Sequence, residues 1–486
     1  MRACRTLLQV TAIAVVAVPA AAQDAKELVV RHVERHAAAY AATAQRIWDL
    51  AEVGYQERES SGLLQRHLRD AEFKVEAGVA GIPTAFVASF GSGRPVIAIL
   101  AEFDALPGIT QSRSPERDAV AAKPAGHACG HHLFGTGSTA AALAVKDWLA
   151  SSGRPGTIRV YGTPAEEGGS GKVYMVRGGL FDDVDVVLHW HADDENSADA
   201  SSSLANKSAK FRFRGVSAHA AAAPERGRSA LDGVEAMNHM VNMMREHVPA
   251  ASRIHYVITS GGSAPNVVPD FAEVYYYVRH PDPEMVRAIF DRVVKAAEGA
   301  ALGTGTQVTH EVIGGVYNLL PIVALAETMH ANLSALGGVA YTADERRFAD
   351  VLRRSLPADV PPIEAAAQVK PLEVILGARP GGGSTDVGDV SWVVPTVGLR
   401  TATWVPGTAS HSWQAIAAGG TTIGEKGMLV AAKTLARSAV DLFLKPDLVA
   451  RARAEFEQRR GPTYRYVSLV GDRAPPLDYR NAPGNN

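Results

Sequence analysis

Apolar and polar positions follow two regular patterns along the N-terminal part of the chain, and together they predict helices and buried strands. Apolar residues recur at helical spacing over 25–50 and 57–71, and an alanine- and leucine-rich helix is expected at 132–151. Three further segments are continuous apolar runs that end in polar residues: 94–108, 156–172 and 184–196. Such runs are typical of buried strands in an α/β domain, whose site lies at the loops where the strands end.

The pattern changes near Asn206, where alternating strands replace the continuous apolar runs. Over residues 206–317 the expected order is strand, helix, strand, strand, helix, strand. That order is typical of a ferredoxin-like α+β unit. Strands and helices of the first kind return after Tyr317, so the sequence predicts one larger domain, residues 23–205 and 318–445, interrupted by a smaller one.

Both ends of the chain differ from these two domains. Two arginines precede an apolar run over 7–18 and an Ala-x-Ala motif at 20–22. This order predicts a signal peptide, residues 1–22, cut before Gln23, and therefore a periplasmic or secreted protein. The run is too short to span a bilayer. The tail, residues 446–486, is charged and Pro-rich, and we expect one helix followed by an extended or loosely packed end.

The charge and the cysteine count of the chain limit which partners it can bind and what its cysteines can do. A chain of 486 residues favours two domains, and a net charge of −2 with a pI near 6.8 indicates no nucleic-acid or anionic-membrane surface. A small-molecule partner is expected instead. The two cysteines are Cys4, which leaves with the signal peptide, and Cys129, so the mature chain forms no internal disulfide. The thiol of Cys129 is therefore either buried and inert or held by a metal.

Candidate metal ligands gather at the predicted strand ends. They are Cys129 and His131, Glu166 and Glu167, His189 and His191, and His411. Thiolate, imidazole and carboxylate groups together suit zinc or a similar divalent cation. Side chains two apart on a helix point about 200° from each other, so the first pair is expected in the turn that precedes helix 132–151. Two adjacent glutamates can divide the work, one binding metal and the other serving as a general base.

Each of these features alone has a commoner explanation. A His-x-His on a strand is more often packing, with one of its histidines supporting the other, and paired glutamates are usually a solvated surface. Cys129 could instead be a nucleophile served by His127, His131 or His132, although no cysteine-protease signature surrounds it. The coincidence of mixed ligand types at the strand ends of one domain favours the metal site.

With these residues in view, the chain resembles the M20 metallopeptidase family. It is most similar to the amidohydrolase branch that holds the p-aminobenzoyl-glutamate, amino-acid-conjugate and hippurate hydrolases. The resemblance runs from "AEVGYQERESS" to about residue 445, and its most specific part is "GHACGH" followed by "PAEEGG". It implies a mixed-sheet catalytic domain interrupted by a ferredoxin-like lid that also dimerises. The expected assembly is a homodimer or a higher homo-oligomer.

The resemblance also implies roles for individual residues. One or two divalent ions, zinc or manganese, would be held by a set of five ligands: Cys129, His131, Glu167, His191 and His411. Glu166 would be the general base that takes a proton from metal-bound water. The lid histidine, His219, would reach a partner subunit's site and stabilise the oxyanion, while Asn266 and Arg279 would hold the substrate's carboxylate or oxyanion.

One motif departs from the wider family. Where that family has His-x-Asp, this chain has Glu102-Phe103-Asp104, and Asp104 is therefore expected to orient a ligand. The amidohydrolase branch also lacks this histidine and uses the cysteine, in agreement with Cys129. His132 stands where the branch often has Asp or Asn.

The function that the resemblance implies is hydrolysis of an amide bond. Expected substrates are N-acyl or N-aroyl amino acids such as p-aminobenzoyl-glutamate, or small dipeptides. The first rival is an aminopeptidase or dipeptidase, which would need a free α-amine on its substrate. The second is a binding protein on an inactive scaffold, and it ranks last because the base and all ligands are present in the sequence.

Overall fold

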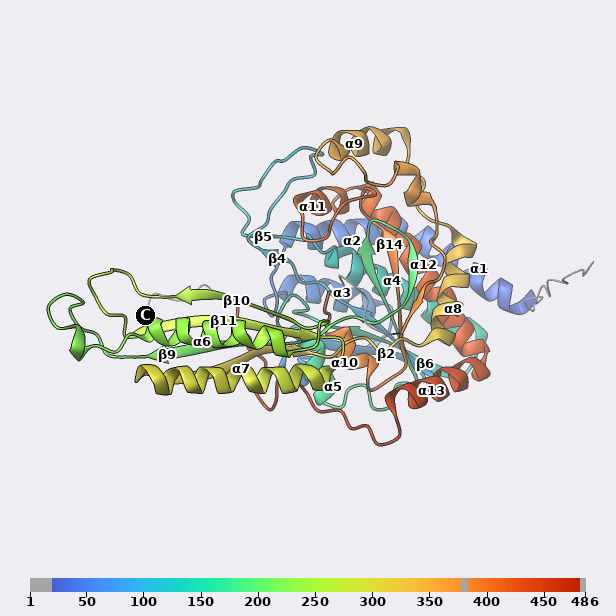
Figure 1. The fold of residues 1–486 in the computed structure, drawn as a ribbon. Coiled ribbons are helices and arrows are strands. Elements are labelled where there is room, and N and C mark those ends of the chain that lie inside the picture. Colours follow the sequence, from blue (N-terminus) through green and yellow to red (C-terminus); the bar gives the residue numbers. More distant parts are fainter. Residues whose placement is uncertain (1–19, 377–382, 481–486) are drawn as a thin grey trace, which may run out of the picture.

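The larger of the two domains is built on a mixed sheet of eight strands. The computed structural model describes residues 20–376 and 383–480 (Figure 1). The sheet order is β1-β2-β6-β3-β7-β14-β8-β13. The strands are β1 (Lys74–Ala77), β2 (Phe86–Ser92), β3 (Val96–Ala101), β6 (Gly156–Gly162), β7 (Val186–Asp193), β8 (Ser197–Ser201), β13 (Val374–Ile375) and β14 (Thr396–Ala402). The four neighbours β6, β3, β7 and β14 are parallel, so their carboxyl ends share one edge.

Helices cover this sheet. They are α1 (Ala20–Arg35), α2 (Ala37–Leu50), α3 (Arg58–Asp70), α4 (His131–Ser152), α5 (Gly171–Arg177), α8 (Val323–Leu336), α9 (Ala343–Arg353), α10 (Val387–Ser391), α11 (Trp413–Gly419), α12 (Thr422–Leu444) and α13 (Pro446–Arg460). The short elements are β4 (Leu106–Pro107), β5 (Ala125–Gly126), η1 (Val79–Gly81) and η4 (Ile363–Ala367). Helices α4 and α12 pack against each other and both contact the sheet, and a Cβ on Gly137 of α4 would lie 3.0 Å from Met428 Cγ of α12 and 3.1 Å from Trp190 Cζ2 of β7.

The inserted domain has the predicted order β9-α6-β10-β11-α7-β12. Its elements are β9 (Ala205–Arg214), η2 (Pro224–Arg226), α6 (Ala230–Met244), η3 (Arg245–His247), β10 (Arg253–Ser260), β11 (Phe271–His280), α7 (Pro283–Thr304) and β12 (Gln307–Val316). They form an antiparallel sheet in the order β10-β11-β9-β12, with α6 and α7 packed against it around a separate apolar core. Figure 1 shows this domain projecting to one side of the larger one. The predicted fold class is therefore confirmed.

Two details of the elements differ from the sequence predictions. The helix expected over 25–50 is two helices, because α1 ends at Arg35 and α2 begins at Ala37. The end of the chain is extended, as expected, but it is not loosely packed. After α13, the hydroxyl of Tyr466 donates to Asp389 at 2.6 Å, and the ring of Tyr479 packs edge-on against that of Tyr55.

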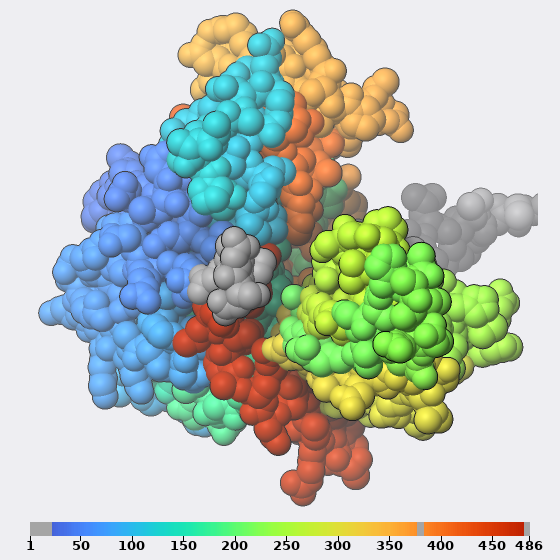
Figure 2. All heavy atoms as spheres, turned by 90° about the vertical axis from the view of Figure 1, so that its left-hand side faces the viewer, coloured from blue at the N-terminus to red at the C-terminus, as the bar shows by residue number. Residues whose placement is uncertain are grey.

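Figure 2 shows the red C-terminal residues on the surface between the blue N-terminal part and the green and yellow inserted domain. The predicted signal peptide, residues 1–22, lies almost wholly outside the described residues. Among the described residues, no helix combines the length and the apolar character that crossing a membrane requires.

Candidate metal centre

The candidate site lies where the four parallel strands end. Glu102 and Asp104 follow β3, Glu166 and Glu167 follow β6, and His191 lies near the end of β7. The loop after β14 carries His411, and the turn before α4 carries Cys129. All of these side chains except that of Asp104 line a cavity of about 830 Å³, which the inserted domain also lines. The polar residues that follow the apolar strands in the sequence therefore meet at one edge of the sheet.

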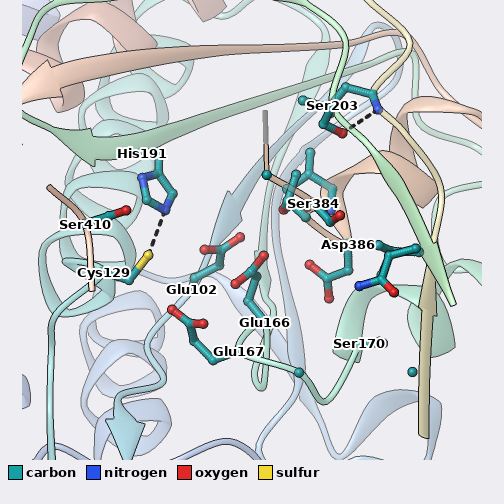
Figure 3. Close-up of a pocket in the computed structure, with 18 of the residues that line it drawn as sticks. Glu102, Cys129, Glu166, Glu167, Ser170, His191, Ser203, Ser384, Asp386 and Ser410 are labelled. Carbon is teal, nitrogen blue, oxygen red and sulfur yellow. Dashed lines mark hydrogen bonds between the residues drawn. The ribbon is translucent and has the colours of Figure 1, made fainter. Parts of the chain in front are cut away.

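Cys129 lies in a tight turn, and His131 is the first residue of α4. The sequence predicts both in the turn, so the helix begins one residue earlier than expected. Gly130, between them, has a φ of 75°, and a Cβ there would lie 2.3 Å from the Cβ of Ala192. Glycine is therefore required, and it lets the thiol and the imidazole approach the same point. Cys129 Sγ lies 3.3 Å from His191 Nε2 (Figure 3).

The two histidines are oriented by acceptors on their Nδ1 atoms. His131 Nδ1 lies 2.9 Å from Asp104 Oδ1, and His191 Nδ1 donates to the carbonyl of Ala192 at 2.7 Å. These contacts leave both Nε2 atoms facing the cluster, which is the arrangement of metal-binding histidines. Asp104 also accepts the backbone N–H of Glu167 at 2.9 Å, so it joins the β3 and β6 loops.

Glu167 and His411 form the side of the cluster next to the solvent. His411 Nε2 lies 3.2 Å from Glu167 Oε1, and this contact raises the pKa of His411. His411 has a φ of 59°, and its backbone N–H donates to the carbonyl of Ala128 at 2.9 Å. The loop after β14 is thereby held against the turn that carries Cys129.

Burial perturbs the two groups whose roles matter most for mechanism. Burial raises the pKa of Glu166 well above its usual range, and the carboxylates of Glu102 and Glu167 raise it further. Burial also raises the pKa of the Cys129 thiol. A thiol with a raised pKa is a poor nucleophile, which argues against the cysteine-nucleophile alternative.

The residues present fit a divalent cation. Their ligand atoms form three overlapping groups, each with all atoms within 4.8 Å of one another: Cys129, His131 and His191; Cys129, Glu167 and His411; Glu102, His131 and Glu166. Three buried atoms that face the cluster are in ion-pair contact but make no well-aligned hydrogen bond with the described residues: Glu102 Oε2 and His131 Nε2, 3.1 Å apart, and Glu167 Oε1, 3.2 Å from His411 Nε2. Figure 3 shows the three glutamates pointing into one space beside Cys129. Buried carboxylates so close together call for a positive charge.

A buried lysine beside this cluster is not found from the sequence. Lys172, on α5, lies 2.7 Å from Glu102 Oε1 and 2.6 Å from Asp386 Oδ1, and all three side chains are fully buried. Lysine is normally a surface residue, so no sequence signal marks this one. Because it pairs with one oxygen of Glu102, the other oxygen stays directed at His131 Nε2, 3.1 Å away.

The remaining predicted residues separate into two sets. Arg279 lines the cavity and donates to Ser384 Oγ at 3.1 Å. His189 also lines the cavity, but it belongs to none of the three ligand groups. His219 and Asn266 are exposed on the inserted domain and do not line the cavity. They lie close together, since the N–H of Ala220 donates to the carbonyl of Asn266 at 3.0 Å.

Comparisons with known proteins agree with this picture. A family model described as the peptidase dimerisation domain matches residues 205–304. The chain is 41% identical over 442 residues to one subunit of the p-aminobenzoyl-glutamate hydrolase of Escherichia coli, covering 86% of this chain and 92% of that one. It is 30% identical to Xaa-Arg dipeptidase of Mus musculus, covering 86% and 88%. An aminobenzoyl-glutamate utilization protein from Klebsiella pneumoniae shares the fold with a TM-score of 0.59 at 19% identity, covering 85% and 97%.

Proposed function

The chain belongs to the M20 family of metal-dependent amide-bond hydrolases, and from this we propose that it hydrolyses N-acyl or N-aroyl amino acids of the p-aminobenzoyl-glutamate type. The observation that carries the proposal is the buried cluster at the strand ends, in which thiol, imidazole and carboxylate groups converge. The relative with 41% identity supports the substrate class through its name.

The proposed ligands of one or two zinc or manganese ions are the five residues of the resemblance: Cys129, His131, Glu167, His191 and His411. Their support is the proximity of their ligand atoms and the orientation of the histidines. A bound divalent cation lowers the pKa of water and polarises an amide carbonyl. Asp104 keeps the His131 ring in place through Nδ1, so the metal affinity depends on it as well.

Glu166 is the proposed general base. A divalent cation held by the neighbouring ligands would counter the burial that raises the pKa of Glu166 and keep its carboxylate ionised. That carboxylate accepts a proton as the oxygen of water adds to the amide carbon, and it passes the proton to the nitrogen as the carbon–nitrogen bond breaks. The products are a carboxylic acid and a free amino acid. Glu166 lines the cavity, and no hydrogen bond from another described side chain occupies it. The carboxylate is therefore free to face the substrate.

The oligomer and the location of the protein belong to the same proposal. We infer a homodimer through the inserted domain, here called the lid, in which His219 of one protomer serves the partner's site. Its support is the dimerisation-domain match and the position of His219 outside its own cavity. The Escherichia coli relative is named as one of two different subunits, so a hetero-oligomer is the alternative. Export rests on the leader pattern of residues 1–22.

A panel of amides tests the reaction. Purified protein is given p-aminobenzoyl-glutamate, benzoyl-glycine and dipeptides with a free α-amine, and release of the amino acid is measured. We expect cleavage of the amides without an α-amine. Glu166→Gln should lower kcat by about 10²- to 10⁴-fold while metal content and thermal stability stay unchanged.

The control is Glu76→Gln, on the exposed face of β1, which should behave as the wild type. Cleavage of the dipeptides alone would favour the dipeptidase function that the name of the Mus musculus relative suggests. Full activity of Glu166→Gln would contradict the assigned base.

A further inference from the structure

The last described residues of the chain run along the lid and end in the substrate cavity. We call residues 461–480 the C-terminal strap. Nη2 of Arg473, a strap residue, lies 2.9 Å from Oε1 of Glu311 on β12. The backbone carbonyls of Gly471 and Arg473 accept from Arg177 of the larger domain at 2.7 and 2.8 Å. The strap is therefore fixed to both domains.

The end of the strap is fixed to the loop that carries the proposed base. The carbonyl of Leu477 accepts from the Gln56 side chain at 2.8 Å. The hydroxyl of Tyr479 donates to the carbonyl of Glu167 at 3.0 Å, and its ring packs against Tyr55 with centroids 5.6 Å apart. These contacts set the position of the next residue, Arg480.

Arg480 lines the cavity and has an unused hydrogen-bonding capacity. Its Nη2 donates to the carbonyl of Glu167, and no other hydrogen bond or ion pair joins Arg480 to the described residues. Its Nε is buried and has no partner there. Arg400, in the same cavity, is different, because it pairs with Asp193 at 2.6 Å and Asp199 at 3.3 Å.

Arg279 resembles Arg480 and not Arg400, because it also lacks an ion pair with the described residues. It lines the same cavity, and its Nε is also buried without a partner among the described residues. Its guanidinium lies 5.4 Å from the ring centroid of Tyr277, whose hydroxyl lies 3.2 Å from that of Tyr275. Burial raises the pKa of Tyr275, and the positive charge of Arg480 opposes that rise. The cavity thus holds two guanidinium groups that no carboxylate of the described chain neutralises.

Half-buried guanidinium groups without a counter-ion favour an anionic ligand, and carboxylates fit their planar fork. The amino-acid part of the substrate carries one α-carboxylate, and a single arginine such as Arg279 is enough to bind it. We propose that Arg480 binds a second carboxylate, that of an acidic side chain, so that the strap selects amides of glutamate or aspartate. This assignment rests on the proposed function. It also opposes a preference for an arginine residue in that position, which two cations would repel.

The test compares two substrates that differ only in this charge, p-aminobenzoyl-glutamate and p-aminobenzoyl-glutamine. Arg480→Gln should lower kcat/KM for the glutamate compound by about ten- to a hundredfold, mainly through KM, and leave the glutamine compound within about threefold. Arg480→Lys should retain part of the preference, because it keeps the charge but loses the fork. The matched control is Arg465→Gln, an exposed strap residue, which should behave as the wild type.

Equal losses on both substrates would overturn the proposal, since they would mean that Arg480 only holds the Glu167 carbonyl in place. No loss on either substrate would overturn it too. Binding to the Glu166→Gln protein, measured by calorimetry with and without Arg480→Gln, separates this proposal from the proposed function. A glutamate preference in binding that needs Arg480 supports the strap's role even if the wild type cleaves neither compound. Its absence contradicts that role.

Discussion

At the scale of single residues, the site depends on a few positions that accept only one type of residue. Gly130 is the clearest case, since it separates the proposed ligands Cys129 and His131 and has the backbone conformation of a left-handed turn. Its missing side chain leaves the room that Ala192 fills from β7. The geometry of the two ligands therefore depends on a residue that has no functional group of its own.

Replacing Gly130 with alanine should damage both the fold and the metal site. The positive φ and the contact with Ala192 together should lower the free energy of unfolding by about 2–5 kcal/mol, and the metal content should fall. Denaturant unfolding and elemental analysis measure the two effects. The control is Gly153→Ala at the other end of α4, with a φ of 62° and nothing within 4 Å of the added Cβ. It should lose about 1–2 kcal/mol and keep its metal, and a similar metal loss in both variants would contradict the account.

At the scale of elements, the continuous apolar runs made β3, β6 and β7 predictable, because a buried strand must be apolar on both faces. Their polar ends made the clustering of Glu167 and His191 predictable as well. The break between α1 and α2 was not, since helical spacing continues through His36. Lys172 and Arg480 were also missed, because charged residues are expected on the surface and the strap has no periodicity to place it. Their positions depend on tertiary contacts alone.

The strap is attached near its start through Asp389 on α10, which predicts a pH effect on stability. Asp389 is fully buried and accepts from Tyr466 Oη at 2.6 Å and from the N–H of Tyr317 at 2.8 Å. Burial raises its pKa to about 7. Because the folded state holds this proton more tightly than the unfolded chain does, the protein loses stability as the pH rises from about 4 to about 7, by up to about 4 kcal/mol from this group.

The replacement Asp389→Asn removes this titration. The difference in unfolding free energy between the variant and the wild type should therefore shift in favour of the variant as the pH rises from 5 to 8. Denaturant midpoints across that range measure it, with the exposed Asp447→Asn of α13 as the control. A difference that does not change with pH would mean that Asp389 is already ionised in the folded protein at pH 5.

At the scale of the whole molecule, the lid separates residues that the proposed mechanism joins. His219 and Asn266 lie outside the cavity that holds Glu166 and Arg279 in the same chain. The edge strand β10 of the lid also exposes apolar side chains, with Val257 57% exposed. The proposed second protomer would cover this edge, in line with the dimerisation-domain match.

Mixing two inactive variants tests whether His219 acts across subunits. His219→Ala and Glu166→Gln should each be inactive alone. When equal amounts are allowed to exchange subunits, half of the dimers are hybrids and each has one intact site, so about a quarter of the wild-type activity should return. No recovery, although mass measurement shows that hybrids have formed, would mean that His219 acts in its own chain or not at all.

The central claim is that Cys129, His131, Glu167, His191 and His411 hold the metal on which amide hydrolysis depends. The most direct test is to measure hydrolysis of p-aminobenzoyl-glutamate together with bound metal per chain, before chelation, after it, and during re-addition of zinc or manganese. We predict that activity is lost with the metal and returns in proportion to the metal that rebinds. Undiminished hydrolysis by the metal-free protein would contradict the claim.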